Sequence, residues 1–339
     1  MTQMNRQILL AARPQGEATT ANFRSVQTAV PAPTEGQVLV RHHYLSLDPY
    51  MRGRMNDTRS YAPPQALDAV MIGGTAGVVI ESRNARWQVG DAVTGYGGWQ
   101  EYSIVDGNLP GALQKVDAAR APLSAWLGAL GMPGVTAWHG LTRIIAPKAG
   151  ETVLVSSAAG AVGSVVGQLA KARGCRAVGI AGGAGKCRYV VEELGFDACI
   201  DHRAQGDLES MRAALRGACP DGLCGIFENV GGLGLDAALL VANDFARVAL
   251  CGMIAGYNGV PVPLASPQLL LTRRMRVEGF IVSEHPSSWP PAREELLALH
   301  AAGRLKYRES IAQGLENAPD AFIGLLQGRN LGKQLVQLA

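Results

Sequence analysis

The sequence predicts an α/β protein made of two domains, a mostly antiparallel, barrel-like β domain and a doubly wound parallel sheet. Three observations predict this fold. Residues 1–125 are rich in short strands and turns. From about residue 126 onward, strands alternate with helices, which is the pattern of βαβ units. A glycine-rich turn also joins the first of these later strands to its helix, as in dinucleotide-binding domains.

Composition excludes several classes of protein. The 339 residues are enough for about two domains, and the net charge of +3 without a basic run argues against nucleic-acid binding. No apolar stretch approaches the roughly 18 residues of a transmembrane helix, and the first residues lack a signal peptide. We therefore expect a cytoplasmic protein that contacts no membrane. The six cysteines lie between 175 and 251 without a C-x₂-C pair, and we expect them to be reduced and mostly buried.

The first domain is expected to contain short strands, because apolar runs alternate there with loops rich in proline and glycine. No glycine-rich strand-to-helix turn occurs among them, so an antiparallel barrel fits better than βαβ units. The expected strands are 8–10, 37–44, 76–80, 91–95 and 100–105.

The second domain is expected to contain a six-stranded doubly wound sheet. Two helices come first, at 124–130 and 135–144, separated by a Gly-Met-Pro-Gly break. The expected strands are 152–156, 176–181, 197–200, 223–228, 246–252 and 276–282, with helices near 161–173, 185–194, 207–217 and 234–242. The tail, with helices at 290–302 and 318–327 and a strand at 335–338, is expected to return to the first domain. The expected division is 1–125 with 300–339 for the first domain and 126–299 for the second.

Residues 151–186 predict a dinucleotide site. A β-branched run at 152–155 predicts a buried strand, and the helix after it carries apolar residues at 162, 165, 166, 169 and 170 on one face. Ala158, Gly160 and Gly163 have little or no side chain, so the backbone of this turn can approach phosphate oxygens at the helix N-terminus. The turn departs from G-x-G-x-x-G in having Ala158 at the place of the first glycine.

The second strand of this unit favours NADP(H) over NAD(H). NAD-binding proteins usually present an acid about 20 residues past the glycines, to hold the adenosine ribose. Here 181–185 contain no acid, and Lys186 and Arg188 follow. Glycines leave room for a 2′-phosphate, and a basic side chain forms charge-assisted hydrogen bonds with it. The alternative is a solvated helix N-terminus that carries basic residues by chance.

Four motifs resemble one enzyme family. GMPGVTAWHGL (131–141), AAGAVGSVVGQLAK (158–171), LDPYMRGRM (47–55) and NLGKQLV (330–336) are similar to those of the medium-chain dehydrogenase/reductase superfamily. Within it they resemble the zinc-independent alkenal/one oxidoreductases, the group of prostaglandin reductase and plant double-bond reductases. The resemblance covers nearly the whole chain. It implies a discontinuous GroES-like β-barrel catalytic domain, an inserted Rossmann domain and an active site in the cleft between them.

The resemblance also implies that no catalytic metal is present. Leu45 stands where zinc-dependent relatives have a cysteine, and Gly73 and Gly74 stand at their His-Glu places. Zinc needs three protein ligands and an open position. The histidines His42, His43 and His139 have no cysteine or carboxylate companions at ligand spacing.

By the same resemblance, Tyr257 is the candidate catalytic residue, because the matching tyrosine touches the nicotinamide ribose and relays or donates a proton. A tyrosine hydroxyl, with a pKa near about 10, stays protonated at neutral pH as a donor must. The alternative is a tyrosine that only anchors its loop. The candidate substrate-binding residues are aromatic or lie in the LDPYMR loop. The alternative role for each of them is packing between the domains, and the arginine could instead pair with an acid. They are Tyr50, Met51, Arg52, Tyr96 and Trp99.

The cofactor residues implied by the resemblance follow the predicted strands. His202 stands where relatives have a tyrosine near the adenosine phosphate, and Arg203 beside it is a second candidate for that phosphate. The full set is Thr136, Ala158, Gly160, Ala161, Val162, Gly163, Gly182, Lys186, His202, Asn229, Cys251, Tyr257, Phe280, Ile281, Val282 and Asn330.

The expected function is therefore NADPH-dependent reduction of the C=C bond of α,β-unsaturated ketones or aldehydes, with hydride delivered to the β-carbon. Two alternatives stay open, an NADPH:quinone reductase and a non-catalytic NADPH-binding protein. The apolar run 252–271 beside the last strands suggests a homodimer formed at the edge of the Rossmann sheet. The alternative for that run is a loop buried within the chain.

Overall fold

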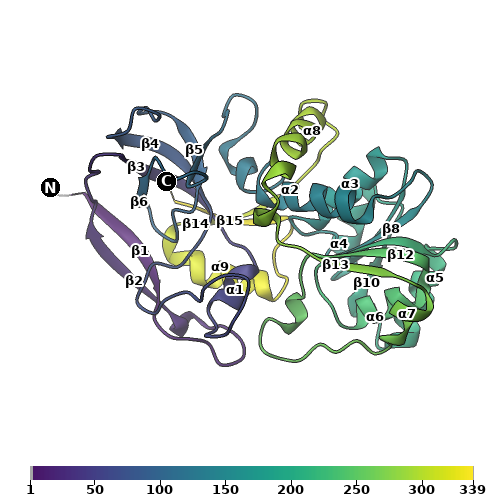
Figure 1. Cartoon of the computed structure of the whole chain (residues 1–339). Coiled ribbons are helices and arrows are strands. Elements are labelled where there is room, and N and C mark those ends of the chain that lie inside the picture. Colours follow the sequence, from purple (N-terminus) through teal and green to yellow (C-terminus); the bar gives the residue numbers. More distant parts are fainter. Residues whose placement is uncertain (1–2, 339) are drawn as a thin grey trace. The chain divides into compact units, whose positions relative to one another are not determined.

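A computed structural model describes residues 3–338, which form two compact units (Figure 1). Unit 1 holds the described residues of Met1–Leu127, Glu309–Asn330 and Gln334–Ala339. Unit 2 holds Gly128–Arg308 and Leu331–Lys333. The chain thus leaves unit 1, builds unit 2, and returns to unit 1.

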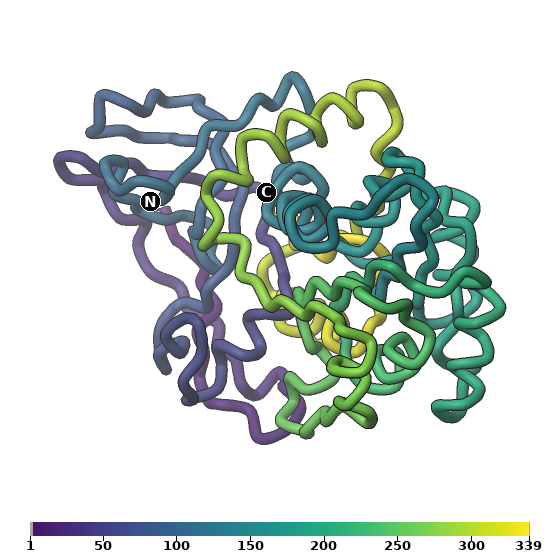
Figure 2. The backbone as a smooth tube through the Cα atoms, turned by 45° about the vertical axis from the view of Figure 1, so that its right-hand side comes forward, coloured from purple at the N-terminus to yellow at the C-terminus, as the bar shows by residue number. Residues whose placement is uncertain are grey.

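Every strand pairing recorded for unit 1 is antiparallel. The strands β1 (Met4–Leu10) and β2 (Phe23–Ala29) form a two-stranded sheet. A seven-stranded sheet has the order β14-β15-β3-β4-β5-β7, with β6 paired to β3. Its strands are β3 (Gln37–Ser46), β4 (Thr75–Ser82), β5 (Ala92–Gly95), β6 (Tyr102–Asp106), β7 (Leu113–Lys115), β14 (Glu309–Gln313) and β15 (Lys333–Gln337). The pairing of β15 with β3 brings the end of the described chain back to this unit, and the colours of Figure 2 follow the chain from its purple first strands to its yellow C-terminal segment.

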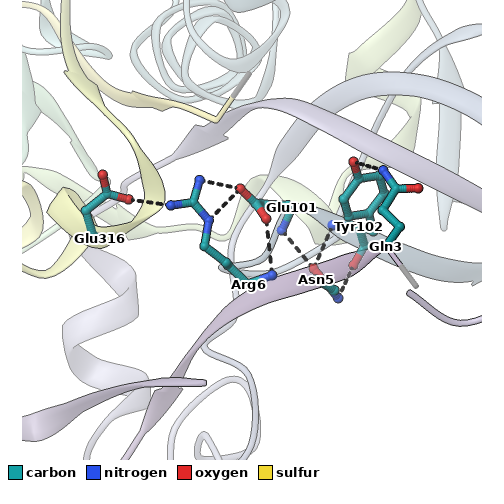
Figure 3. A network of polar contacts seen from close by, with 6 residues as sticks. All are labelled: Gln3, Asn5, Arg6, Glu101, Tyr102 and Glu316. Carbon is teal, nitrogen blue, oxygen red and sulfur yellow. Dashed lines mark hydrogen bonds and ion pairs between the residues drawn. The ribbon is translucent and has the colours of Figure 1, made fainter. Parts of the chain in front are cut away.

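A polar network ties the start of the chain to strand β6 (Figure 3). The Asn5 side chain is buried, donates to the Tyr102 carbonyl oxygen at 3.0 Å and accepts from the Tyr102 amide at 3.0 Å. Arg6 forms an ion pair with Glu101, at 2.6 Å, and another with Glu316, at 3.1 Å. Because both partners of a buried polar group are present, the group costs little to bury. The network therefore fixes β1 against β6 and against the returning C-terminal segment.

Unit 2 is a doubly wound parallel sheet. Its strand order is β10-β9-β8-β11-β12-β13, which is 3-2-1-4-5-6 in order of appearance within the unit. The strands are β8 (Thr152–Ser156), β9 (Arg176–Ala181), β10 (Ala198–Asp201), β11 (Leu223–Glu228), β12 (Ala242–Leu250) and β13 (Arg276–Gly279). The strand order reverses between β8 and β11, which is where such sheets bind ligands. The fold class expected from the sequence is thus confirmed.

Helices cover both faces of the parallel sheet, with α2 and α3 above it and α5, α6 and α7 below it in Figure 1. The helices of unit 2 are α2 (Met132–His139), α3 (Gly163–Ala172), α4 (Ala184–Arg188), α5 (Leu208–Ala218), α6 (Leu233–Val241), α7 (Gln268–Thr272) and α8 (Trp289–Ala301). Unit 1 contributes α1 (Tyr50–Arg54) and α9 (Ala318–Leu326).

Some elements differ from the sequence expectation. The sequence did not indicate β2, β7, β14 or α1, because β2 is mostly exposed without alternating polarity and the others have three to five residues. The helix expected at 124–130 is a short 3₁₀ segment, Leu123–Leu127. Unit 2 extends to Arg308, beyond the expected return at residue 300. The Gln168 side chain of α3 holds the Lys306 backbone there, donating to its carbonyl oxygen at 2.8 Å and accepting from its amide at 2.7 Å.

Candidate functional site

The carboxyl ends of the six strands of unit 2 meet at one edge of the sheet, because all six run parallel. Most of the candidate cofactor residues follow these ends. After β8 come Ala158, Gly160, Ala161, Val162 and Gly163, and after β9 come Gly182 and Lys186. The end of β10 is followed by His202, that of β11 by Asn229, and that of β12 by Cys251 and Tyr257. After β13 come Phe280, Ile281 and Val282. The topology thus brings residues from six separate stretches of sequence to one edge.

The turn after β8 is made of backbone. Ser157 has a φ of +52°, which turns the chain sharply out of the strand. A Cβ added to Gly163 would lie 2.3 Å from the Ser157 carbonyl oxygen, so only glycine fits there. A Cβ on Gly160 would lie 2.9 Å from the Ser157 hydroxyl oxygen. The turn is closed further by Gly332, whose amide donates to the Ala159 carbonyl oxygen at 2.9 Å.

This turn fits a dinucleotide pyrophosphate. The first amides of α3 lie at the positive end of the helix dipole. A Cβ at 160 or 163 would collide with Ser157, so glycine at both positions lets the turn close tightly. Donors directed at anionic oxygen, with no side chain in the way, are what a pyrophosphate requires.

A cluster of basic side chains surrounds the turn after β9. A Cβ on Gly182 would lie 2.9 Å from His202 Nε2 and 3.2 Å from Arg203 Nε, so both side chains lie over this glycine. Burial and the nearby Arg203 lower the pKa of Lys186. Burial, then Arg203, lower the pKa of His202, with Lys186 a smaller cause. Lys186 and Arg203 thus bring two cationic side chains to these glycines, and the His202 imidazole beside them can donate a hydrogen bond, which together suits an anion such as a 2′-phosphate.

Asp201 organises this cluster without filling it. Its Oδ1 accepts from the Gly183 amide at 2.7 Å and from the Arg203 amide at 3.0 Å. These hydrogen bonds, with the Gly183 bond as the largest cause, lower the pKa of Asp201. Gly183 has a φ of +99°, which favours glycine, and it caps α4. The aspartate therefore fixes the shape of the turn that presents Lys186.

The ends of β8 and β11 are joined by a buried carboxylate. Glu228 Oε1 accepts from the Ser156 hydroxyl at 2.7 Å, the Val230 amide at 2.6 Å and the Gly231 amide at 2.8 Å. Burial raises the pKa of Glu228, although these hydrogen bonds oppose the shift. Asn229 adds two more bonds to Ser156, one from its amide and one from its side chain, both at 2.7 Å. These bonds hold the two turns at the sheet's switch point in register.

Tyr257 lies beside the end of β12. A Cβ on Gly252 would lie 3.2 Å from the Tyr257 hydroxyl oxygen and 3.2 Å from the Asn229 carbonyl oxygen. The hydroxyl is therefore close to the ends of both β11 and β12. Tyr257 is partly exposed and follows a 3₁₀ turn, Ile254–Gly256, to which its amide is bonded at 3.2 Å. The structure thus brings the candidate catalytic hydroxyl to the same edge as the glycine turn.

The other candidate cofactor residues occupy different settings. Thr136 is buried in α2, where its hydroxyl donates to the Met132 carbonyl oxygen at 2.7 Å. Phe280 is buried between His139 and Phe227. Burial raises the pKa of Cys251 to about 12, with Glu228 adding to the shift. The remaining candidate, Asn330, belongs to unit 1.

In unit 1, Tyr50 and Tyr96 form part of an aromatic cluster. Burial, and then Asp48, Tyr96 and Tyr61, raise the pKa of the Tyr50 hydroxyl well above its ordinary value, so these groups lie near one another. Tyr96 is 65% exposed and Tyr61 is 53% exposed. The cluster offers two accessible rings with phenolic hydroxyls, which suits a flat conjugated ligand.

Met51, Arg52 and Trp99, which the sequence analysis places at the substrate site, lie in the interior of unit 1. All three side chains are buried in unit 1. Trp99 stacks on Phe23 at 5.3 Å and meets Phe322 edge-on at 5.6 Å. Met51 packs in the same apolar cluster. The Arg52 guanidinium donates to the Gly16 carbonyl oxygen at 2.6 Å and to Asn56 Oδ1 at 2.7 Å. These side chains hold the α1 segment in place, so they support Tyr50.

The region that would hold zinc in other dehydrogenases is apolar here. A Cβ on Gly73 would lie 2.8 Å from Leu45 Cδ1 and 3.0 Å from Trp99 Cδ1. Leu45 is fully buried. Within residues 3–338 no three His, Cys, Asp or Glu side chains form a group that could hold a metal ion. In the same described part of the chain, no helix combines the length and hydropathy needed to cross a membrane.

Several residues at these sites escaped the sequence analysis. What these residues share is a contact between segments that are far apart in the sequence. They are Glu228, Ser156, Asp201 and Tyr61. A polar residue at the end of a predicted parallel strand was the available signal for the first three. Tyr61 follows a Ser in a loop and carried no such signal.

Two protein families match the chain. Residues 6–115 match the family described as "N-terminal domain of oxidoreductase". Residues 161–298 match the family described as "Zinc-binding dehydrogenase".

Curated relatives extend over nearly the whole chain. The chain is 45% identical to "NADPH-dependent curcumin reductase" of Escherichia coli (strain K12), covering 99% of this chain and 98% of the relative. It is 42% identical to "2-alkenal reductase (NADP(+)-dependent)" of Nicotiana tabacum, covering 89% and 87%. It is 40% identical to "Prostaglandin reductase 1" of Rattus norvegicus, covering 95% and 96%.

Solved structures agree with these relatives. The structure of CurA from Vibrio vulnificus in complex with NADPH matches with a TM-score of 0.91 at 45% identity, covering 98% of this chain and 99% of that chain. Escherichia coli quinone oxidoreductase complexed with NADPH matches with a TM-score of 0.78 at 19% identity, covering 98% and 99%, and at that identity shares the fold alone.

Proposed function

The chain belongs to the zinc-independent double-bond reductases of the medium-chain dehydrogenase/reductase superfamily, and from that premise we propose how its residues divide the reaction. Such a protein is an NADP-dependent oxidoreductase acting on the C=C bond of α,β-unsaturated carbonyl compounds. The observation that carries the residue roles is the convergence of Tyr257, the glycine turn and the basic cluster on one edge of the sheet.

The cofactor-binding residues divide into three groups. The backbone of 158–163 holds the pyrophosphate, and Lys186 with His202 and Arg203 holds the 2′-phosphate. Glu228 and Asn229 keep the turns after β8 and β11 in register beside the nicotinamide end. When bound, NADPH supplies the hydride that adds to the β-carbon of the substrate.

Tyr257 supplies the proton. Adding a hydride to the β-carbon leaves negative charge on the α-carbon and the carbonyl oxygen of the substrate. A protonated tyrosine hydroxyl close to the ends of β11 and β12 can donate to either atom. The donated proton completes the saturated ketone or aldehyde, and water restores the tyrosine proton.

The experiment compares Tyr257→Phe with Tyr189→Phe. The first change removes the proposed donor and keeps the ring. The second removes another tyrosine hydroxyl of unit 2, on a residue that is buried. We expect kcat to fall about 10–10³-fold for Tyr257→Phe. NADPH affinity should change little in both variants, because phosphates are held elsewhere. If kcat is unchanged in Tyr257→Phe while hydride transfer is rate-limiting, the tyrosine is only structural.

The substrate range follows from the accessible rings of Tyr96 and Tyr61 beside Tyr50, which favour flat conjugated enones. The relatives named for curcumin and 2-alkenals suggest that both extended and short enones should be tried. NADPH consumption with curcumin, a 2-alkenal and a quinone separates the alternatives. A higher kcat/KM for either enone than for the quinone supports the proposal, and the reverse order would favour a quinone reductase. No turnover of any of the three would favour a non-catalytic NADPH-binding protein.

A second copy of the chain is proposed to add to the edge of the parallel sheet. β13 is the edge strand, its four residues are exposed, and Val277 on it is 43% exposed. Leu271 nearby in the sequence is 80% exposed. Exposed edge strands present unpaired backbone groups that can pair with a second copy, and Val277 and Leu271 add apolar surface there. Sedimentation should show a dimer that Val277→Lys shifts toward monomer, whereas Val89→Lys in unit 1 should leave it unchanged. A wild-type monomer at micromolar concentration contradicts the proposal.

The cytoplasm is the proposed compartment. All six cysteines are free thiols, which are typical of reducing compartments. Fractionation of the source cells with an antibody to the chain would test it, and recovery mainly in the membrane or secreted fraction would contradict it.

A further inference from the structure

Two cysteine thiols meet beneath the cofactor edge of unit 2. Cys187 lies on α4 and Cys199 lies on β10, and their sulfur atoms are 3.1 Å apart. Both residues are partly exposed. A disulfide bond has an S–S length of about 2.05 Å, so the sulfurs need to approach by only about 1 Å. Neither thiol takes part in the reaction described above.

The neighbours of the pair connect it to the cofactor residues. Lys186 directly precedes Cys187 in the sequence. A Cβ on Gly179 would lie 3.3 Å from the Cys199 sulfur and 2.7 Å from the Ala158 Cβ. The pair thus lies between the residue proposed to bind the 2′-phosphate and the start of the glycine turn.

The two thiols are not equivalent. Cys199 is the donor of the hydrogen bond between them, so its proton points at the Cys187 sulfur. This bond favours the thiolate form of Cys187, and a hydrogen bond with the Ala181 backbone adds to it. Burial still raises the pKa of both thiols, and it does so far more for Cys199. Cys187 is therefore the better nucleophile, and Cys199 is placed to react with it afterwards.

From this geometry we propose that Cys187 and Cys199 are a redox modification site that a hydroperoxide converts to a disulfide, and that the disulfide weakens NADPH binding. The Cys187 thiolate attacks the peroxide oxygen, the O–O bond breaks, and a sulfenic acid and an alcohol or water form. The Cys199 sulfur then attacks the Cys187 sulfur of that sulfenic acid and displaces its hydroxide. The hydroxide takes the Cys199 proton and leaves as water, and the disulfide bond forms. Two thiols lose two electrons in total, and the hydroperoxide gains them.

The effect on the cofactor follows from the shift of α4. Closing the sulfur gap moves Cys187 toward β10, and Lys186 moves with it because the two are covalently adjacent. A hydrogen bond between charged groups is sensitive to such displacement. NADH lacks the 2′-phosphate, so its binding should be affected less. The disulfide therefore acts on the discrimination between the two cofactors.

The experiment exposes the folded protein to hydrogen peroxide and maps its peptides without reduction. We expect one cross-link, between the peptides that carry Cys187 and Cys199, with four cysteines remaining as thiols. The Kd for NADPH should rise about 3–10-fold, because the shift of Lys186 weakens one charged hydrogen bond without removing it. Reduction with dithiothreitol should restore the original Kd. The Kd for NADH should change by less than about twofold on the same scale.

Variants keep the proposal open to refutation. Cys187→Ser and Cys199→Ser should each abolish both the cross-link and the peroxide effect on the Kd. Cys224→Ser, which changes a partly exposed cysteine on β11, should leave both intact. Sulfinic acid at Cys187 without a cross-link would overturn the proposed site. A cross-link that leaves the ratio of NADPH to NADH affinity unchanged would overturn its proposed effect.

Discussion

The site in unit 2 is built mainly from backbone, whereas the proposed substrate residues of unit 1 are side chains. In unit 2 the glycine turn is defined by positions where a Cβ would collide with Ser157 and by amides at the start of a helix. In unit 1 the corresponding features are aromatic rings, whose exposure depends on the segments that pack over them. Trp99 is fully buried, whereas Tyr96 is 65% exposed.

This difference explains why sequence reasoning works better for unit 2. A residue type that the backbone requires, such as Gly163, is readable from its local pattern. An aromatic residue is compatible with both a core and a binding site, and only distant contacts decide between them. The four predictions below test this contrast, from the largest expected effect to the smallest.

The first prediction separates core from ligand contact in unit 1. Trp99→Ala should lower the free energy of unfolding by about 3–5 kcal/mol, because it empties a packed site between Phe23 and Phe322. Tyr96→Ala, at an exposed ring, should change it by less than about 0.5 kcal/mol and raise KM for the enone instead. Denaturant titration and steady-state kinetics measure the two effects. Equal stability of the two variants would place Trp99 outside the core.

The second prediction tests the basic cluster of unit 2. Lys186→Ala removes one cation from the proposed 2′-phosphate site and should weaken NADPH binding about 10–100-fold, or about 1.5–3 kcal/mol. NADH binding should change much less, since it has no such phosphate. Lys171→Ala is a matched control, because that lysine pairs with Asp197 on the α3 side of the sheet. Equal losses for both cofactors would remove Lys186 from the proposed site.

The third prediction tests whether backbone alone defines the pyrophosphate turn. Gly163→Ala should destabilise the turn by about 1–3 kcal/mol and weaken both NADPH and NADH, because its Cβ meets the Ser157 carbonyl oxygen. Gly185→Ala in α4 has nothing within 4 Å of the added Cβ and should be tolerated. Calorimetric titration with each cofactor measures the effect. Unchanged binding by Gly163→Ala would show that the turn adapts.

The fourth prediction concerns pH and the core of unit 1. Burial, then His43, lower the pKa of His42 to about 3, and the unfolded value is 6.5. His42 therefore binds a proton more tightly in the unfolded chain than in the folded one. The stability that this neutral histidine contributes is fully present above pH 6.5 and is lost as the pH falls toward 3. At pH 5 the loss from this group is about 2 kcal/mol.

Hydrogen exchange of the β3 and β6 amides at pH 7 and pH 5 can measure this loss. His42→Asn should reduce the pH dependence in unit 1 while lowering stability at pH 7, because the bond of His42 Nε2 to the Ser103 hydroxyl at 2.8 Å is altered. His139 and His202 also have lowered pKa values, but both lie in unit 2 and serve as an internal comparison. An unchanged slope in unit 1 would contradict the assignment.

The sequence predicted most of the fold for a physical reason. Apolar runs that alternate with helical patterns indicate the strands of βαβ units, so all six strands of unit 2 were expected even where they are short. The exposed strand β2 carries no period, and it forms because β1 offers a partner along its length. At the site, the turn residues and Lys186 were expected, while Glu228 and Asp201 were not. Their roles depend on hydrogen bonds between the ends of strands that are far apart in the sequence.

The discontinuity of unit 1 sets an order for folding during synthesis. Residues 44–46 of β3 pair with β15, which the ribosome delivers only after all of Gly128–Arg308. Until then, residues 44–46 of β3 lack their β15 partner on one side, while unit 2 can already assemble its sheet. Such an unpaired strand edge can associate with other chains. The Gly332 contact that closes the turn after β8 arrives at the same late moment. A nascent chain should thus complete the seven-stranded sheet of unit 1 and the cofactor turn of unit 2 together, at the end of translation.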